Sequence, residues 1–242
     1  MSKQVRLDKY LADMNVGTRS EVKNLIKKKR VKVNGVVVNK DNLKIDIEND
    51  EVMLDGSIIK YVEFEYYMLN KPAGVVSATE DSKDRTVVDL IKGNTKELFP
   101  VGRLDKDTEG LLILTNDGQL AHNLLSPKKR VDKKYYAKID GIVDVEHIEQ
   151  FSKGLNINYE YVTKPALLEI ISADKENNQS EIYVTITEGK YHQVKRMFKA
   201  IGMEVTYLKR ISMGEVILDN ELGLGEYRHL TEEELKLLKN CL

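Results

Sequence analysis

Cysteine is almost absent from this chain of 242 residues, which contains only Cys241. A single cysteine cannot form an intramolecular disulfide, so nothing requires an oxidising compartment and a cytoplasmic location is expected. The four histidines lack the close spacing of zinc ligands, so no metal site is expected. No apolar run approaches the roughly 20 residues that span a bilayer, and the first ten residues show no signal peptide.

Charge, by contrast, is abundant and unevenly distributed. Residues 1–45 contain twelve Lys or Arg and four Asp or Glu, a net charge of +8. The whole chain carries −1, so the remaining residues carry −9. A basic head on an acidic body is typical of a polyanion-binding module joined to a second domain.

The head contains signals for two helices and a hairpin. Apolar residues three to four apart predict a helix over residues 7–14, and Thr18 with Glu21 forms the capping-box pattern that begins a second helix. The dipeptide Asn34-Gly35 lies between alternating valines, which predicts a tight β-hairpin. These elements together favour a compact RNA-binding fold.

Basic side chains gather where the second helix gives way to the hairpin. The alternative is that the sequence KKKR at 27–30 is only a solvated helix end, where cations suit the helix dipole. The candidates for RNA contact in the head are Arg19, Lys27, Lys28, Lys29, Arg30 and Lys32.

Beyond a domain boundary near residue 60, the pattern changes to that of an α+β body. The apolar run LLILT at 111–115 predicts a fully buried strand, and 144–153 and 191–201 predict helices. A short helix is also expected at 86–91. Further strands are expected at 134–139, 166–172 and 181–187. Short connections between many strands favour a largely antiparallel sheet with flanking helices.

Three carboxylates lie close together in GRLDKDTEGLLILTNDG, residues 102–118. Asp105, Asp107 and Glu109 resemble the beginning of a calcium loop, but the position that needs a bidentate glutamate is Asn116. A pair of carboxylates can also cleave a glycosidic bond, yet the sequence does not show an acid opposite Asp105. Asp105 is therefore a nearly solitary carboxylate without a histidine, cysteine or serine beside it.

A second stretch, TEGKYHQVKRMFKAIG at 187–202, predicts an amphipathic helix. Its apolar residues form one stripe and leave Lys195, Arg196 and Lys199 on other faces. Taken alone, this is an ordinary surface helix with solvated charges.

Several of these stretches together resemble the RsuA-type pseudouridine synthases. The resemblance covers nearly the whole chain and implies an S4-like RNA-binding domain at 1–60 and a catalytic domain at 61–242. It also implies that a uridine in ribosomal RNA is isomerised without a cofactor or a metal. The matching segments, in the order of the family, are RLDKYLADMNVGTRSEVKNLIKKKRVKVNG (6–35), NKPAG (70–74), GRLDKDTEGLLILTNDG (102–118), DKKYYAKI (132–139), KPALLE (164–169) and EGKYHQVKRMF (188–198).

The resemblance also implies roles for individual residues. Asp105 matches the catalytic aspartate, which explains why one carboxylate suffices, and Lys195 matches the basic residue that pairs with it. Tyr135 matches the active-site tyrosine, although Tyr136 beside it is a departure that puts the choice between them in doubt. Arg103 matches the residue that fills the space left by the flipped nucleotide and holds phosphate.

The motifs KPALLE and YHQVKRMF resemble the small-subunit branch, whose usual target is uridine 516 of 16S rRNA. The expected partner is therefore ribosomal RNA within a small-subunit assembly intermediate, bound by a monomer, with no membrane involved. A 23S rRNA enzyme of the same family and a non-catalytic RNA-binding or ribosome-assembly factor are the alternatives.

Overall fold

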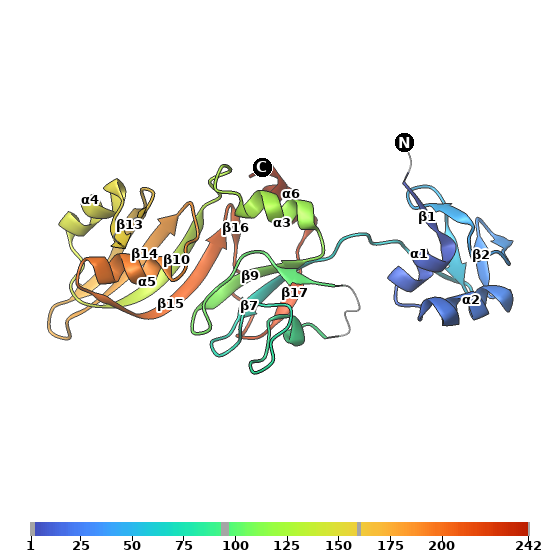
Figure 1. The fold of residues 1–242 in the computed structure, drawn as a ribbon, viewed down its shortest axis with the longest axis horizontal. Helices are drawn as coiled ribbons and strands as arrows, with labels where there is room; N and C mark the ends of the chain where they lie inside the picture. The colour runs from blue at the N-terminus through green and yellow to red at the C-terminus, as the bar shows by residue number, and fades with distance from the viewer. Residues whose placement is uncertain (1–2, 93–96, 159–160, 242) are drawn as a thin grey trace. The chain divides into compact units, whose positions relative to one another are not determined.

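The computed structural model describes residues 3–92, 97–158 and 161–241, which form two compact units (Figure 1). The smaller unit, the head, extends to Phe64, and the larger one comprises residues 65–92 and those from 98 onward. The predicted boundary near residue 60 lies a few residues before this change of unit. Among the described residues, no helix is long and apolar enough to span a membrane.

The head combines two helices with short strands. Strand β1 pairs with β4, and the other four strands form a sheet in the order β3-β2-β5-β6. The elements are β1 (Gln4–Arg6), α1 (Leu7–Asp13), α2 (Arg19–Lys27), β2 (Val31–Val33), β3 (Val36–Val37), β4 (Lys44–Asp46), β5 (Val52–Leu54) and β6 (Ser57–Ile58).

The predicted start of α2 and the predicted hairpin are confirmed. The Glu21 backbone N–H donates to Thr18 Oγ1, and the Thr18 N–H donates to a Glu21 carboxylate oxygen at 2.7 Å, which is a complete capping box. Asn34 and Gly35 have φ angles of 50° and 76°, the left-handed values that the tight turn between β2 and β3 needs. Val22 and Ile26 of α2 pack into the core of the head.

The larger unit is built on a sheet of nine described strands. Seven lie in the order β13-β14-β10-β15-β9-β7-β17, with β16 beside β15 and β8 beside β9. Strands β9 and β15 pair in parallel and the other pairs of this sheet are antiparallel, as expected for a largely antiparallel mixed sheet.

The strands of the larger unit, including the separate β11–β12 pair, are β7 (Tyr66–Lys71), β8 (Phe99–Pro100), β9 (Glu109–Thr115), β10 (Lys133–Asp140), β11 (Asn156–Asn158), β12 (Tyr161–Val162), β13 (Leu167–Asp174), β14 (Gln179–Ile186), β15 (Glu204–Met213), β16 (Val216–Ile217) and β17 (Tyr227–His229). Its helices are η1 (Val88–Leu90), α3 (Gly118–Leu125), α4 (Val145–Lys153), α5 (Gln193–Ala200) and α6 (Glu232–Asn240). The helix expected at 86–91 is only the single 3₁₀ turn η1.

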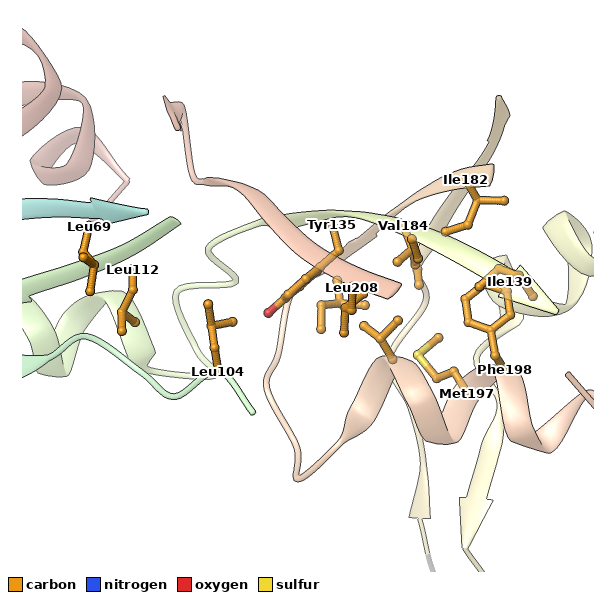
Figure 2. Close-up of a cluster of buried hydrophobic side chains, with 14 of the residues drawn as sticks. Leu69, Leu104, Leu112, Tyr135, Ile139, Ile182, Val184, Met197, Phe198 and Leu208 are labelled. Carbon is orange, nitrogen blue, oxygen red and sulfur yellow. The ribbon is translucent and has the colours of Figure 1, made fainter. Parts of the chain in front are cut away.

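Strand β9 is apolar along its length because both of its faces are covered. Leu111 and Ile113 pack in a cluster with α3 and α6, whereas Leu112 and Leu114 belong to a second cluster with α4 and α5. Figure 2 shows part of the second cluster, in which Leu112 and residues of α5 contribute to the same core. Each fully buried leucine stabilises such a core by ~1.5–3 kcal/mol.

The ten-residue strand β15 has no counterpart among the sequence predictions. Its polar positions conceal the alternation expected of a strand, because Arg210 is buried and Lys209 precedes it. The strand nevertheless pairs with both β10 and β9. Its parallel pairing with β9 is at the beginning of β9, where Lys209 and Arg210 lie opposite Glu109 and Gly110.

Candidate active site

The loop before β9 holds Asp105 beside the junction of β9 and β15. Gly110 lies opposite Arg210 in the parallel register and has a φ of 98°. A Cβ at Gly110 would lie 2.3 Å from the carbonyl oxygen of Arg210, so the two backbones approach too closely for a side chain. Glycine is therefore required where the Asp105 loop enters the sheet.

Two buried side chains fix the backbone of this loop. The Lys71 ammonium, at the end of β7, donates to the carbonyl oxygens of Thr108 at 2.8 Å and Asp105 at 3.1 Å. Ser77 Oγ donates to the carbonyl of Leu104 at 2.9 Å and accepts from its N–H at 3.0 Å. Burial lowers the pKa of Lys71 to about 8. The loop is thus held by its main chain, which leaves the Asp105 carboxylate available.

The Asp105 carboxylate, 23% exposed, faces two groups of the segment 192–195. Lys195 Nζ lies 3.5 Å from Asp105 Oδ2 and 2.5 Å from Asp107 Oδ1, and His192 Nε2 lies 3.5 Å from Asp105 Oδ1. Partial burial raises the pKa of Asp107, but the hydrogen bond and charge of Lys195, together with a backbone hydrogen bond and the charge of His192, outweigh it and hold that pKa below its usual range. One cation therefore bridges both aspartates.

A cavity of about 650 Å³ opens beside Asp105. Arg103, Tyr135 and His192 line it together with Asp105. Tyr135 is only 8% exposed, and Figure 2 shows its ring extending from β10 toward Leu104. Three of the four residues that the resemblance singled out in the larger unit, Arg103, Asp105 and Tyr135, thus line the cavity. The fourth, Lys195, lies beside Asp105.

Tyr136 lies on the other face of β10 from Tyr135. Its ring packs against Tyr183 and Tyr207, with centroids 6.0 Å away in each case. Burial and a hydrogen bond to Glu181 raise the pKa of Tyr136 to about 12. Of the two adjacent tyrosines, it is Tyr135 that lines the cavity.

Two further cations are buried in the cavity wall. Lys133 Nζ donates to the carbonyl of Val131 at 2.7 Å, and Arg210 Nε donates to the carbonyl of Leu111 at 2.7 Å. Burial, with the nearby charge of Arg210, lowers the pKa of Lys133 to about 8. Two buried cations therefore contribute to the lining of the cavity in addition to exposed Arg103.

The six basic residues predicted to contact RNA in the head are all exposed. Lys27 ends α2, Lys28 and Lys29 follow it, and Lys32 lies on β2. Arg30 differs from the others because its guanidinium pairs with the carboxylate of Asp55. The predicted basic cluster is thus present, with one member already engaged by an acid.

Among the described residues, no group of three or more His, Cys, Asp or Glu side chains is arranged to hold a metal ion. Glu109, the third carboxylate of the loop, accepts a hydrogen bond from the Tyr207 hydroxyl at 2.7 Å.

Two family models match the chain. The S4 domain matches residues 5–60, and RNA pseudouridylate synthase matches residues 65–200. The chain belongs to the RNA pseudouridylate synthase family. It is an RsuA-type pseudouridine synthase with an S4 domain, as the sequence motifs indicated.

Relatives match this pseudouridine synthase over nearly its full length. It is 53% identical to the uncharacterized RNA pseudouridine synthase YtzG of Bacillus subtilis (strain 168), covering 97% of this chain and 98% of the relative. It is 42% identical to ribosomal large subunit pseudouridine synthase B of the same organism (97% and 95% covered). It is 41% identical to ribosomal small subunit pseudouridine synthase A of Vibrio cholerae serotype O1 (strain ATCC 39315 / El Tor Inaba N16961) (96% and 98% covered).

A solved structure described as a crystal structure of pseudouridylate synthase is also similar. It is 36% identical and has a TM-score of 0.67, covering 97% of this chain and 99% of the other. The synthase fold is therefore shared along the chain.

The geometry adds several residues that sequence reasoning did not assign to the site, among them His192 beside Asp105. Lys71 and Ser77 act on the main chain of the Asp105 loop, and Asp107 is the nearer partner of Lys195. The motif NKPAG did draw attention to the region of Lys71, but its sequence shows only a turn. Contacts between residues 27 or more apart in the chain carry no local sequence signal.

Proposed function

We propose that this pseudouridine synthase acts on ribosomal RNA and isomerises uridine 516 of 16S rRNA, with Asp105 as the catalytic carboxylate. The observation that carries the proposal is the arrangement of Asp105 in a cavity lined by Tyr135, with Lys195 Nζ 3.5 Å from the carboxylate. These groups fit the isomerisation, and each comes from a different segment of the chain.

The reaction breaks the N1–C1′ bond of uridine, turns the uracil and forms a C5–C1′ bond. A proton leaves C5 and one is taken up at N1, so no atom is gained or lost and no electron is transferred. One carboxylate therefore suffices. Asp105 either attacks the nucleotide covalently or removes a 2′ proton to begin an elimination.

The neighbouring side chains supply what Asp105 lacks. Lys195 places a positive charge 3.5 Å from the Asp105 carboxylate, where it can stabilise negative charge during the reaction. Tyr135 stacks its ring on the uracil, and its hydroxyl takes part in removing the C5 proton. The target base must leave its stack, at an expense of a few kcal/mol, and exposed Arg103 at the cavity fills the space and holds phosphate.

Residues 1–60 form the RNA-binding domain in this proposal, and residues 61–242 form the catalytic domain. Six exposed cations of the head, Arg19, Lys27, Lys28, Lys29, Arg30 and Lys32, attract RNA phosphates without specifying bases. The chain acts in the cytoplasm as a monomer. Its partner is 16S rRNA within a small-subunit assembly intermediate, where the target uridine is still accessible.

A 23S rRNA target is the second candidate, and a specific observation supports it. The identity to ribosomal large subunit pseudouridine synthase B, 42%, matches the 41% to ribosomal small subunit pseudouridine synthase A. The small-subunit target is favoured by KPALLE (164–169) and YHQVKRMF (191–198), which resemble that branch.

Mapping of pseudouridine in rRNA tests the proposal. The purified enzyme is given 23S rRNA, naked 16S rRNA, 16S rRNA carrying some ribosomal proteins, and mature small subunits. Carbodiimide labelling followed by primer extension then locates the product. We expect modification at uridine 516, strongest in the partly assembled particle and weakest in the mature subunit. Product found only in 23S rRNA would replace the small-subunit target, and no product in any rRNA would contradict the proposed function.

A further inference from the structure

Tyr191, directly before α5, is an unusually exposed aromatic residue. Its side chain is 77% exposed, whereas the only other exposed Tyr or Phe among the described residues, Phe64, is 39% exposed. Burying an aromatic ring is favourable, so a ring left in water at a functional site commonly has a partner to bind. Tyr191 lies at such a site, because it lines the same cavity as Asp105.

The ring of Tyr191 is held in place by stacking. Its centroid lies 3.9 Å from that of His192, with an interplanar angle of 16°. His192 adopts a left-handed backbone conformation (φ 50°) and places Nε2 3.5 Å from Asp105 Oδ1. A two-ring stack therefore leads from the catalytic carboxylate toward solvent.

The turn beneath the stack is rigid. Buried Gln193 accepts from the Lys190 N–H at 2.9 Å and donates to Glu188 at 2.9 Å. Arg196 donates to the carbonyl of Tyr191 at 3.3 Å and to that of Ile157 at 3.0 Å. These bonds fix the backbone on both sides of the rings, so binding a planar group would order little that is not already ordered.

We infer that the stacked Tyr191–His192 pair binds the base of a nucleotide next to the target uridine in the RNA chain. Tyr135 already serves the base inside the cavity, where it is 8% exposed, whereas Tyr191 lies at the open rim. A neighbouring nucleotide is the planar group that an RNA substrate brings to this rim. Arg103 and Lys190 line the same cavity and suit the phosphates on either side of that base.

This assignment rests on the proposed function, since it takes the cavity beside Asp105 to hold the target uridine. Stacking of a base on an aromatic side chain contributes roughly 5- to 150-fold to binding, measured by alanine substitution. The effect is expected in substrate binding, because the flanking base takes no part in the bond changes.

Steady-state kinetics on the rRNA fragment that the wild-type enzyme modifies test the assignment. Tyr191→Ala is expected to raise KM about tenfold with kcat within twofold of wild type, whereas Tyr191→Phe stays within twofold in both. Val145→Ala is the matched control, since Val145 is also 77% exposed but lies at the start of α4. An unchanged KM for Tyr191→Ala, or a loss confined to kcat, would overturn the assignment.

A substrate lacking one base identifies the group that is stacked. Removing the base on one side of the target uridine should raise the KM of the wild-type enzyme about tenfold and that of Tyr191→Ala less than twofold. Equal sensitivity of both enzymes to abasic sites on both sides would contradict the stack. These outcomes are distinct from failure of the proposed function, which shows as a wild-type enzyme that makes no product.

A fluorescence measurement tests the stacking of a base on Tyr191 without requiring catalytic turnover. The probe is a single-stranded RNA with 2-aminopurine on both sides of one uridine, bound to the Asp105→Asn chain. Stacking on Tyr191 should quench the fluorescence, and the Asp105→Asn/Tyr191→Ala chain should show less than half of that quench. Equal quenching by the two chains would refute the assignment.

Discussion

The two units of the protein use cations in opposite ways. In the head, Lys27, Lys28 and Lys29 are exposed at the end of α2, where an RNA phosphate could reach them. In the catalytic unit, Lys71 and Lys133 are buried, and their ammonium groups donate to backbone carbonyls. The net charge of the head therefore reflects exposed lysines that can reach a ligand. The net charge of the catalytic unit does not reveal its buried, hydrogen-bonded lysines.

Burial changes what a lysine can do. An exposed lysine keeps its charge and its freedom, so its contribution to RNA binding is electrostatic and sensitive to salt. Buried Lys71 is fixed by the loop that carries Asp105, and its pKa falls to about 8 because burial disfavours the charge. In the catalytic unit, buried lysines therefore hold backbone in position, whereas the proposed role of the exposed lysines in the head is to attract RNA.

Lys195 is the cation whose removal should have the largest effect. Lys195→Met leaves the carboxylates of Asp105 and Asp107 without the cation that bridges them, so kcat should fall about a thousandfold, roughly 4 kcal/mol. Release of tritium from C5 of labelled uridine in the RNA measures the rate. Exposed Lys199 on the same helix is the control, and Lys199→Met should keep its kcat. A Lys195→Met enzyme with half the wild-type kcat would refute the role of this cation.

Gly110 tests how tightly the Asp105 loop is fitted to the sheet. Gly110→Ala should lower the free energy of unfolding by about 3 kcal/mol, because φ is 98° and the added Cβ would meet the Arg210 carbonyl oxygen. Urea unfolding measures the change. Gly118→Ala is the matched control, since a Cβ there has nothing within 4 Å, and it should not destabilise. Equal stabilities of the two variants would contradict the close approach of β9 and β15.

Lys133 gives the pH dependence that distinguishes buried from exposed lysines. Its pKa of about 8 in the folded chain lies below the ordinary 10.5, so the unfolded chain binds more protons between these values and stability rises with pH. This contribution should amount to about 2 kcal/mol between pH 8 and pH 10. In Lys133→Met the rise should be smaller by that amount in urea unfolding. Control Lys175→Met, at an exposed site, should retain the full rise.

Substitutions of the exposed lysines in the head should have the smallest effect of the four, and their effect on RNA binding should depend most strongly on salt. Replacing Lys27, Lys28 and Lys29 together by Gln removes three exposed charges, which should weaken RNA binding about tenfold at low salt. The slope of log Kd against log salt should fall by about 2, with kcat unchanged. Fluorescence anisotropy with a 16S rRNA fragment measures both quantities. The control replaces three exposed lysines of the catalytic unit, Lys175, Lys236 and Lys239, and an equal loss there would contradict the division of roles.

Elements with local signals were predictable from the sequence. The capping box of Thr18, the turn at Asn34 and the apolar run in β9 depend on residues within a few positions of one another, and the structure has all three. Strand β15 was missed because its buried positions include Arg210, which broke the apolar pattern.

The candidate site was only partly predictable, because its geometry depends on distant segments. The resemblance singled out Asp105 and Lys195, but not that Lys195 lies nearer to Asp107. Adjacent residues on a strand face opposite sides, so one of Tyr135 and Tyr136 had to face the cavity, and only the packing of β10 shows that it is Tyr135. The support that Lys71 gives to the loop spans 34 or more residues and has no sequence signature.

A single substitution tests most directly whether chemistry belongs to the catalytic unit and RNA attraction to the head. Asp105→Asn keeps the size of the side chain and removes the carboxylate. Pseudouridine formation and Kd are measured on the same 16S rRNA particle. The account predicts that product formation falls more than a thousandfold while Kd stays within twofold of wild type. Product formed at a rate comparable to wild type would contradict it.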